Sequence, residues 1–156
     1  MAARTGGQYL QGLRDQEREV WLGGERVKDV TTHPGLRNGA QAIAGLYDMQ
    51  HDPELREAMT YVSPTSGERV GLSFIVPRTR QDLEQRRTMM LHWARATCGM
   101  MGRSPDFMNV TFAAWAGAAD YFAQSRPELG QNIRRYYEHI REGDRSEEHT
   151  SELQVT

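Results

Sequence analysis

Residues 100–109 read MMGRSPDFMN and separate two long stretches with helical periodicity. Gly102 relaxes the backbone of this junction, and Pro105 suits the first turn of a helix, where its missing N–H leaves no bond unmade. Ser104, directly before it, is a candidate N-cap. Arg103 then lies on the connection itself. Its guanidinium suits a carboxylate, a phosphate or a phenolate-like oxygen, but an arginine here also fits a structural role, in which it bonds the last carbonyls of the preceding helix.

Long helices are expected on both sides of this junction. Thr79 followed by Asp82 resembles a capping box and predicts a helix over residues 80–98. A helix to about residue 124 follows the junction, with Ala and Gly residues that allow close approach of a neighbour, and another is expected over 127–142. Two adjacent stripes of the 80–98 helix are expected to pack in the core: Leu83, Arg87, Met90, Ala94 and Thr97 on one, and Met89, Trp93 and Ala96 on the other.

Shorter elements fill the N-terminal half of the chain. Extended runs on both sides of Gly23-Gly24 predict a β-hairpin, because both central positions of a primed turn have positive φ. A second extended pair is joined by turn residues that include Pro64 and Gly67. The expected elements are helices over 5–14 (capped by Thr5), 34–51 and 54–59, and extended runs over 19–22, 25–27, 61–62 and 70–76. The predicted fold class is therefore mainly α, with two short β-hairpin-like segments.

Composition limits the class of protein. The chain has 156 residues and a net charge of −2, so it has no electrostatic footprint for nucleic acid or for an anionic membrane. It has no apolar run long enough to span a bilayer and no signal-peptide pattern, and we expect a cytoplasmic protein. Its single cysteine, Cys98, excludes an internal disulfide and is expected to be a small buried hydrophobe. Because Leu, Ile, Val and Phe are scarce, we expect some helices to bury faces against a surface that this chain does not supply.

The spacing of the polar residues does not indicate a particular reaction. The five histidines do not have metal-ligand spacing, and we expect no metal site. His92 and His139 lie within predicted helices, where a structural role is more common than catalysis. The chain lacks a GxSxG motif, a P-loop and a GxGxxG after a strand. Residue patterns alone thus indicate a mostly helical module with one arginine-bearing junction.

Several segments together resemble the N-terminal region of the 4-hydroxyphenylacetate 3-hydroxylase large-component family. They occur in the same order as in that family and extend over residues 4–144. The segments are RTGGQYLQGLRD (4–15), REVWLGGERVKDVTTHP (18–34), LYDMQHDPELRE (46–57), SPTSGERVGLSF (63–74), GMMGRSPDFMN (99–109) and NIRRYYEHIRE (132–142).

This resemblance implies a fold and an activity. Family members resemble acyl-CoA dehydrogenases, with a helical N-terminal domain, a β-barrel-like middle domain and a C-terminal helical bundle. They are two-component monooxygenases that take reduced FAD from a separate flavin reductase and use O2 to hydroxylate a phenol, such as 4-hydroxyphenylacetate, ortho to its hydroxyl. They are usually homo-oligomers. The resemblance implies no nucleic-acid or membrane partner.

The same resemblance suggests two substrate-binding residues. In the family motif GRSPDY, the Arg and the Tyr four residues later contact the phenol, and a His about forty residues further on completes the cluster. Arg103 matches the Arg, whereas Phe107 replaces the Tyr and removes a hydroxyl. The His is missing, and His149 does not stand in for it. Most FAD contacts in the family come from the other domains, so we assign no catalytic and no cofactor-binding residue in this chain.

The end of the chain differs in character. RSEEHTSELQ (145–154) is polar, lacks periodicity and resembles one reading frame of a common sequencing-library adapter. We expect residues 1–144 to be the N-terminal domain of a truncated aromatic hydroxylase, inactive alone, and 145–156 to be a non-native or an ordinary disordered tail. Two alternatives stay open: a non-catalytic helical scaffold or oligomerisation module, and a relative with altered chemistry. The dehydratase branch of such relatives needs cluster-ligating cysteines, which the lone Cys98 does not supply.

Overall fold

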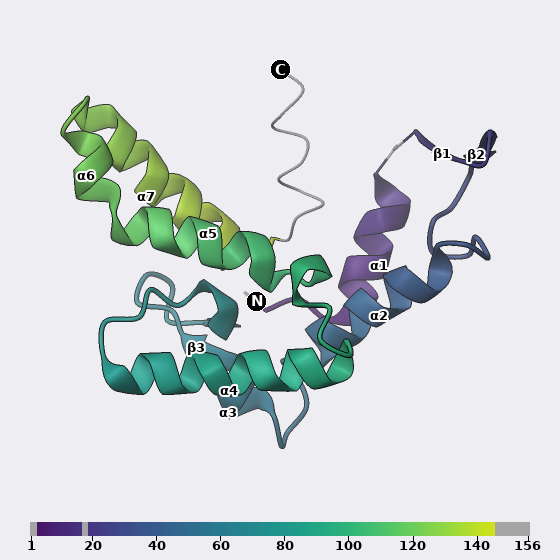
Figure 1. Cartoon of the computed structure of the whole chain (residues 1–156), viewed down its shortest axis with the longest axis horizontal. Coiled ribbons are helices and arrows are strands. Elements are labelled where there is room, and N and C mark those ends of the chain that lie inside the picture. The colour runs from purple at the N-terminus through teal and green to yellow at the C-terminus, as the bar shows by residue number, and fades with distance from the viewer. Residues whose placement is uncertain (1–2, 17–18, 146–156) are drawn as a thin grey trace.

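The computed structural model describes residues 3–16 and 19–145, apart from the side chain of Arg103. It is a helical structure with two small hairpins, as predicted (Figure 1). The helices are α1 Gly6–Asp15, α2 Arg37–Asp48, α3 Arg56–Met59, α4 Arg80–Ala96, α5 Asp106–Gly117, α6 Ala119–Ala123 and α7 Pro127–Glu142, with 3-10 turns η1 Leu72–Phe74 and η2 Met101–Arg103. The strands are β1 Val20–Leu22, β2 Glu25–Val27, β3 Thr60–Val62 and β4 Arg69–Gly71. In the described residues, no helix is both long and apolar enough to cross a membrane.

α1 and α2 pack against each other at the N-terminal end of the fold (Figure 1). Thr5 accepts a hydrogen bond from the Gln8 backbone N–H while the Gln8 side chain accepts from Thr5 N–H, so the expected cap is confirmed. The rings of Tyr9 and Tyr47 stack with centroids 5.3 Å apart. A Cβ on Gly6 would lie 2.4 Å from the Ala44 carbonyl oxygen. The closeness of these helices therefore depends on glycine at position 6.

α2 begins at Arg37, three residues later than expected, because the residues before it form turns.

Both predicted hairpins are present, but the second is shorter than expected. β1 pairs with β2 in the register Trp21↔Arg26, around Gly23 and Gly24 with φ of 61° and 85°. β3 pairs with β4, and the strand predicted over 70–76 ends at Gly71. The next three residues, Leu72, Ser73 and Phe74, form η1 and are all buried, so their side chains do not alternate between two faces.

In a longer β4 strand the backbone carbonyls of Ser73 and Phe74 would be free to pair with a neighbouring strand. In η1 they accept hydrogen bonds from side chains instead. Ser73 O accepts from Arg86, and Phe74 O accepts from the Tyr137 hydroxyl. Leu72 belongs to a core cluster with Leu46, Met59, Met89 and Trp93. Phe74 belongs to a second cluster with Ala113, Tyr137 and Ile140. Three consecutive residues thus join the two main parts of the core.

α4 has the predicted cap but buries only one of the two stripes expected in the core. Thr79 and Asp82 form the capping box. Met89 and Trp93 are buried as predicted, together with Arg86, whereas Ala96 of the same predicted stripe is exposed. Leu83 is 56% exposed and Met90 37%, so the prediction that the Leu83 stripe also lies in the core was wrong. The prediction for Cys98 was also wrong. The helix ends at Ala96, and Cys98 is exposed with φ of 52°, because the chain turns there through two left-handed residues.

α5, α6 and α7 form the C-terminal arm of the fold (Figure 1). The single helix predicted up to residue 124 is broken at Ala118, which separates α5 from α6. α7 has the predicted bounds and begins with Pro127. A Cβ on Gly130 would lie 2.7 Å from the Ala119 carbonyl oxygen, so α6 and α7 approach closely as their small residues predicted.

Candidate functional site

The junction between α4 and α5 is a compact turn closed by its own residues. Gly99, with φ of 86°, leads into η2, and Ser104 follows it. The Ser104 hydroxyl donates to the Met101 carbonyl at 2.7 Å, and Ser104 is buried. Pro105 is the N-cap of α5 and makes no side-chain cap bond. The prediction that Ser104 caps α5 through its side chain was therefore wrong, because this hydroxyl closes the preceding turn instead.

The two predicted site residues lie four positions apart across this turn. The backbone of Arg103 ends η2, and its side chain is outside the described part of the structure. Phe107 lies in the first turn of α5, as expected, and is 52% exposed. The roles of Arg103 and Phe107 as substrate-binding residues stay predictions.

A buried ion pair beneath the junction was missed by the sequence reasoning. Asp106 accepts a hydrogen bond from Arg86 Nη2 at 2.7 Å, and both side chains are at most 10% exposed. Burial raises the pKa of Asp106, against the opposite effect of the Arg86 charge and hydrogen bond. The spacing of Arg86 with Met89 and Trp93 (i, i+3, i+7) was a signal, because a charge on a buried stripe requires a partner.

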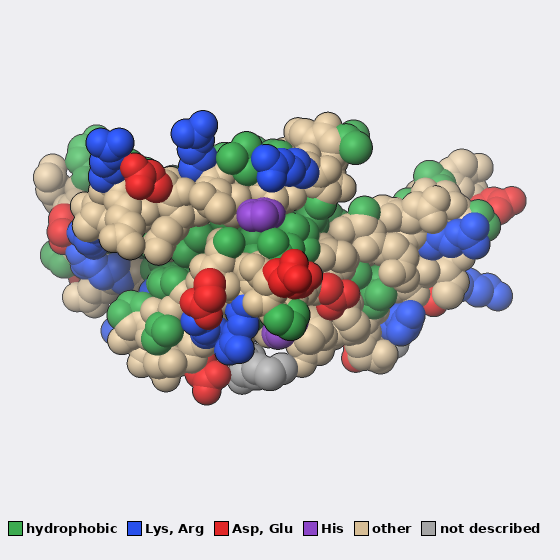
Figure 2. Space-filling model, turned by 90° about the horizontal axis from the view of Figure 1, so that it is seen from below, with side chains coloured by type: hydrophobic (Ala, Val, Ile, Leu, Met, Phe, Trp, Pro, Cys, Tyr) green, Lys and Arg blue, Asp and Glu red, His purple; other side chains and the backbone are tan. Residues whose placement is uncertain are grey.

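An apolar surface adjoins the junction. A hollow of about 410 Å³ is lined by Leu83, Arg86, Arg87, Met90, Leu91, Ala94 and Met101. Met101 begins η2, so the hollow reaches the turn that carries Arg103. Figure 2 shows hydrophobic side chains gathered across the middle of the face seen from below. This arrangement suits packing against another apolar surface better than binding of a polar ligand.

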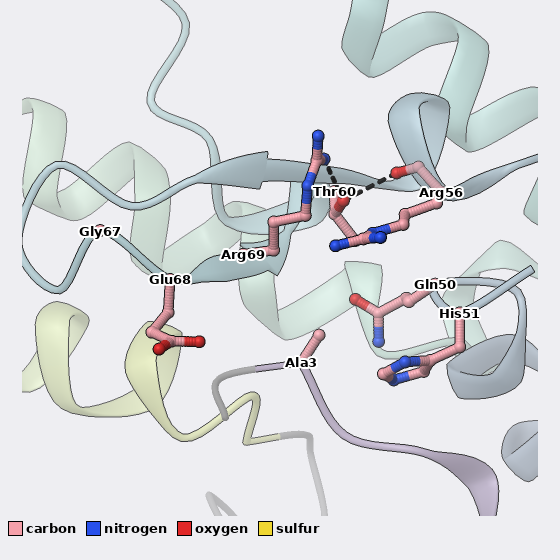
Figure 3. A pocket seen from close by; sticks show the side chains of 8 residues that line it. All are labelled: Ala3, Gln50, His51, Arg56, Thr60, Gly67, Glu68 and Arg69. Carbon is pink, nitrogen blue, oxygen red and sulfur yellow. Dashed lines mark hydrogen bonds between the residues drawn. The ribbon is translucent and has the colours of Figure 1, made fainter. Parts of the chain in front are cut away.

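A polar pocket of about 370 Å³ lies between the N-terminal segment and the second hairpin (Figure 3). Several of its polar groups bond to one another or to residues just outside the pocket. Arg69 donates to Thr60 at 2.8 Å and pairs with Glu57, and a His51 ring nitrogen lies 3.0 Å from the Arg4 carbonyl oxygen. These bonds tie the hairpin and the N-terminal segment to the fold, and we read the pocket as structural.

No group of histidine, cysteine and acidic side chains that could hold a metal occurs among the residues that the structure describes. His92 is half-buried on α4, and His139 is exposed on α7. His149 and the rest of 146–156 lie outside the described residues.

The four hollows found on the described residues do not enclose a ligand as large as FAD. These hollows are open at the surface and measure about 240 to 500 Å³. A bound cofactor is normally enclosed over most of its surface. We therefore assign no flavin contact to this chain.

Comparison with known proteins identifies the family. The family model described as "4-hydroxyphenylacetate 3-hydroxylase N terminal" matches residues 5–152. The chain belongs to this family. The match extends past residue 144, so the domain limit expected there stays a prediction.

Known hydroxylases of this family match the chain over nearly its whole length. The oxygenase component of 4-hydroxyphenylacetate 3-monooxygenase from Thermus thermophilus is 43% identical over 147 residues, which are 94% of this chain and 29% of that protein. A crystal structure of such an oxygenase component, complexed with FAD and 4-hydroxyphenylacetate, superposes with a TM-score of 0.83 at 43% identity, over 92% of this chain and 29% of the other. The chain thus spans about 30% of the length of the curated relatives it matches.

The hydroxylase N-terminal fold extends to a more distant enzyme. An archaeal 4-hydroxybutyryl-CoA dehydratase from N. maritimus superposes with a TM-score of 0.77 at 19% identity, over 91% of this chain. At this identity the likeness concerns the fold alone. The predicted fold class, mainly α with two short β-hairpin-like segments, is confirmed, and it is the fold of the N-terminal part of the oxygenase component.

Proposed function

We propose that this chain supplies the N-terminal part of a two-component, reduced-FAD-dependent monooxygenase that hydroxylates a phenol resembling 4-hydroxyphenylacetate ortho to its hydroxyl. The observation that carries the proposal is the 43% identity to the Thermus oxygenase component over 94% of the chain. One atom of O2 enters the ring and the other leaves as water. Reduced FAD, delivered by a separate reductase, supplies the two electrons for this step.

Within this function, Arg103 and Phe107 bind the phenol. The Arg103 guanidinium bonds the phenolic oxygen and stabilises the negative charge that this oxygen carries when the phenol loses its proton and the ring becomes nucleophilic. Phe107, on the first turn of α5, presents an exposed ring against which the aromatic substrate packs. The apolar surface beside the junction excludes water from this side of the substrate.

A non-catalytic scaffold or oligomerisation module is the second candidate. The observation in its favour is the set of exposed hydrophobic side chains on α4, including Leu83 and Leu91, which is typical of a surface covered in an assembly. This role needs no phenol at the junction. The two candidates therefore differ in whether Arg103 affects turnover.

A chimeric enzyme distinguishes the two candidates. Residues 5–144 of this chain replace the matching region of the Thermus oxygenase component, and hydroxylation of 4-hydroxyphenylacetate is followed with the reductase and FAD present. Arg103→Ala is expected to lower kcat/KM by an amount worth about 2–4 kcal/mol, as for loss of one preorganised donor. The exposed Arg135 provides a matched control as Arg135→Ala. Unchanged turnover with lowered stability in Arg103→Ala would favour the structural role of this arginine.

A further inference from the structure

The Arg86 guanidinium connects three segments below the junction. One terminal nitrogen donates to the Ser73 carbonyl at 2.8 Å, and the other donates to Asp106 at 2.7 Å. One turn further along α5, the Asn109 side chain donates to the Ser73 hydroxyl at 2.7 Å. α4, η1 and the first turn of α5 are thus held by three buried bonds that share Arg86 and Ser73.

These bonds determine how α5 is rotated about its axis. Asp106 and Asn109 are three residues apart and both face the interior, at 5% and 2% exposure. Phe107 and Val110, each one position later, are 52% and 38% exposed. A rotation of α5 that moved Phe107 would have to pull Asp106 away from Arg86. The pair therefore determines which way Phe107 points, and it anchors the helix start that follows Arg103.

Stability alone does not account for a charged pair at this place. Burial of two charges costs desolvation that their attraction recovers only in part, and well-packed apolar residues of similar volume often stabilise a fold equally well. An apolar pair, however, makes no directional bonds and so does not fix the orientation of α5. The guanidinium has a fixed planar geometry and reaches both the Ser73 carbonyl and the Asp106 carboxylate.

We infer that Arg86 and Asp106 are positioning residues for phenol binding: their buried pair orients the first turn of α5, which carries Phe107, and the adjoining η2 turn, which carries the backbone of Arg103. The inference rests on the proposed function for its substrate. Its geometric part, the orientation of the junction by the pair, concerns this chain alone and is measured without turnover.

Hydrogen exchange of the 156-residue chain tests the geometric part. The variant Arg86→Met/Asp106→Leu replaces the pair by apolar side chains and avoids a buried unpaired charge. Its amides over residues 103–109 are expected to exchange about ten times faster than in the unchanged chain, while those of α7 change less than about twofold. The variant Arg80→Met/Glu84→Leu, which removes an exposed ion pair of the same helix, is the control and leaves both regions unchanged. Unaltered exchange at the junction, or a uniform rise over the whole fold, overturns the inference.

The chimeric hydroxylase tests the link to the substrate. Arg86→Met/Asp106→Leu is expected to lower kcat/KM for the phenol on the order of tenfold or more, mainly through KM. Because the variant also leaves the buried Ser73 carbonyl without its Arg86 donor, both proteins are assayed at a temperature well below the lower of their two Tm values. Retention of both KM and kcat would show a purely structural pair and overturn the inference. A chimera that fails to hydroxylate before any substitution contradicts the proposed function instead, and the exchange experiment then still decides whether the pair orients the junction.

Discussion

The residue at position 107 is expected to affect which substrate is preferred. Phe107 stands where the hydroxylase motif has a tyrosine, and its ring is half exposed at the start of α5. In the chimeric enzyme, Phe107→Tyr is expected to raise kcat/KM for the phenol about two- to tenfold, the effect of one added hydrogen bond. Stability of the isolated chain should change by less than about 0.5 kcal/mol, because the new hydroxyl can remain in water. Phe122→Tyr on α6 is the control, and a fall in kcat/KM for Phe107→Tyr would indicate a pocket shaped for a different substrate.

Asp144 links the N-terminal segment to the end of α7 through hydrogen bonds. It is 3% exposed and accepts hydrogen bonds from Arg4 N–H at 2.8 Å and from the Gln50 side chain at 2.9 Å. Burial raises the pKa of this carboxyl, against the effect of those bonds. Its φ of 44° is left-handed, a conformation that asparagine tolerates well.

Substitutions at Asp144 should therefore separate charge from hydrogen bonding. Asp144→Asn keeps an acceptor oxygen and should change the free energy of unfolding by no more than about 1 kcal/mol. Asp144→Ala leaves the part-buried Arg4 N–H and the buried Gln50 amide without an acceptor, and alanine also tolerates the left-handed φ less well, so it should cost about 2–3 kcal/mol more than Asp144→Asn. Urea unfolding of both variants measures the difference. Equal losses would show that the charge, rather than the acceptor, holds the segment.

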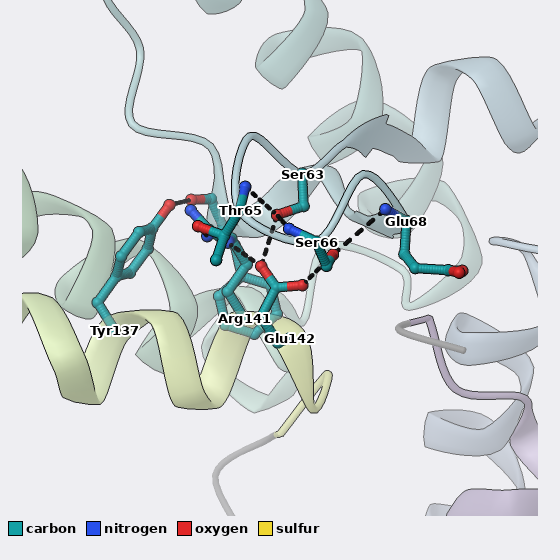
Figure 4. A network of polar contacts seen from close by, with 8 residues as sticks. Ser63, Thr65, Ser66, Glu68, Tyr137, Arg141 and Glu142 are labelled. Atoms are coloured by element: carbon teal, nitrogen blue, oxygen red, sulfur yellow. Dashed lines mark hydrogen bonds and ion pairs between the residues drawn. The ribbon is translucent and has the colours of Figure 1, made fainter.

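At the scale of elements, Glu142 joins the end of α7 to the turn of the second hairpin (Figure 4). Its carboxylate accepts from Ser63 and Ser66 and pairs with Arg141 Nε at 2.8 Å. Burial alone would raise the pKa of Glu142, but these hydrogen bonds and the Arg141 charge together outweigh it and lower the pKa. A carboxyl with a lowered folded-state pKa stabilises the fold above its unfolded pKa, and this stabilisation is lost as pH falls through the folded pKa.

Glu142→Gln should accordingly destabilise the chain in a pH-dependent way. At pH 7 we expect a loss of about 1–2 kcal/mol, the scale of hydrogen bonds to a charged group. Below the unfolded pKa of about 4.3 the loss should shrink toward zero as the wild-type carboxyl takes up its proton. Chemical unfolding across this pH range measures the effect, with the exposed Glu138→Gln on the same helix as control. A loss that is equal at pH 3 and pH 7 would contradict the role assigned to the carboxylate.

Local signals predicted the elements better than their packing. The Thr5 and Thr79 caps, the Gly23-Gly24 turn and the Pro127 helix start depend on neighbours within a few residues, and all were found from the sequence. On α4 the burial of Met89 and Trp93 was predicted, but the Leu83 stripe was expected in the core as well and is exposed, because the covered face depends on tertiary contacts such as those with η1. The Arg86–Asp106 pair was not predicted for the same reason, because residues 20 positions apart meet only through tertiary packing. Arg103 and Phe107 were proposed from resemblance, not from spacing.

At the scale of the molecule, the exposed apolar side of α4 and the greater length of the relatives are both consistent with a surface that is covered in a larger enzyme. Leu83, Met90 and Leu91 are at least 37% exposed and line one hollow beside the junction. The matching Thermus protein is longer, and this chain covers 29% of it. An apolar face next to the proposed phenol-binding turn suits a surface that the rest of such an enzyme covers, because hydroxylation requires a site closed to water.

The chain by itself is therefore expected not to hydroxylate phenols. The hollow beside the junction is open to solvent and does not enclose FAD, whereas catalysis depends on several groups held in a dry, preorganised site. Incubation of the chain with 4-hydroxyphenylacetate, O2, FAD and a flavin reductase should give no catechol above the background without protein. Titration of reduced FAD should likewise show no saturable binding. The chimeric hydroxylase, assayed in parallel, verifies that reductase and substrate are competent. Catechol formed by the chain alone, and lost in Arg103→Ala, would show that the junction and the α4 face make a complete site without any further domain.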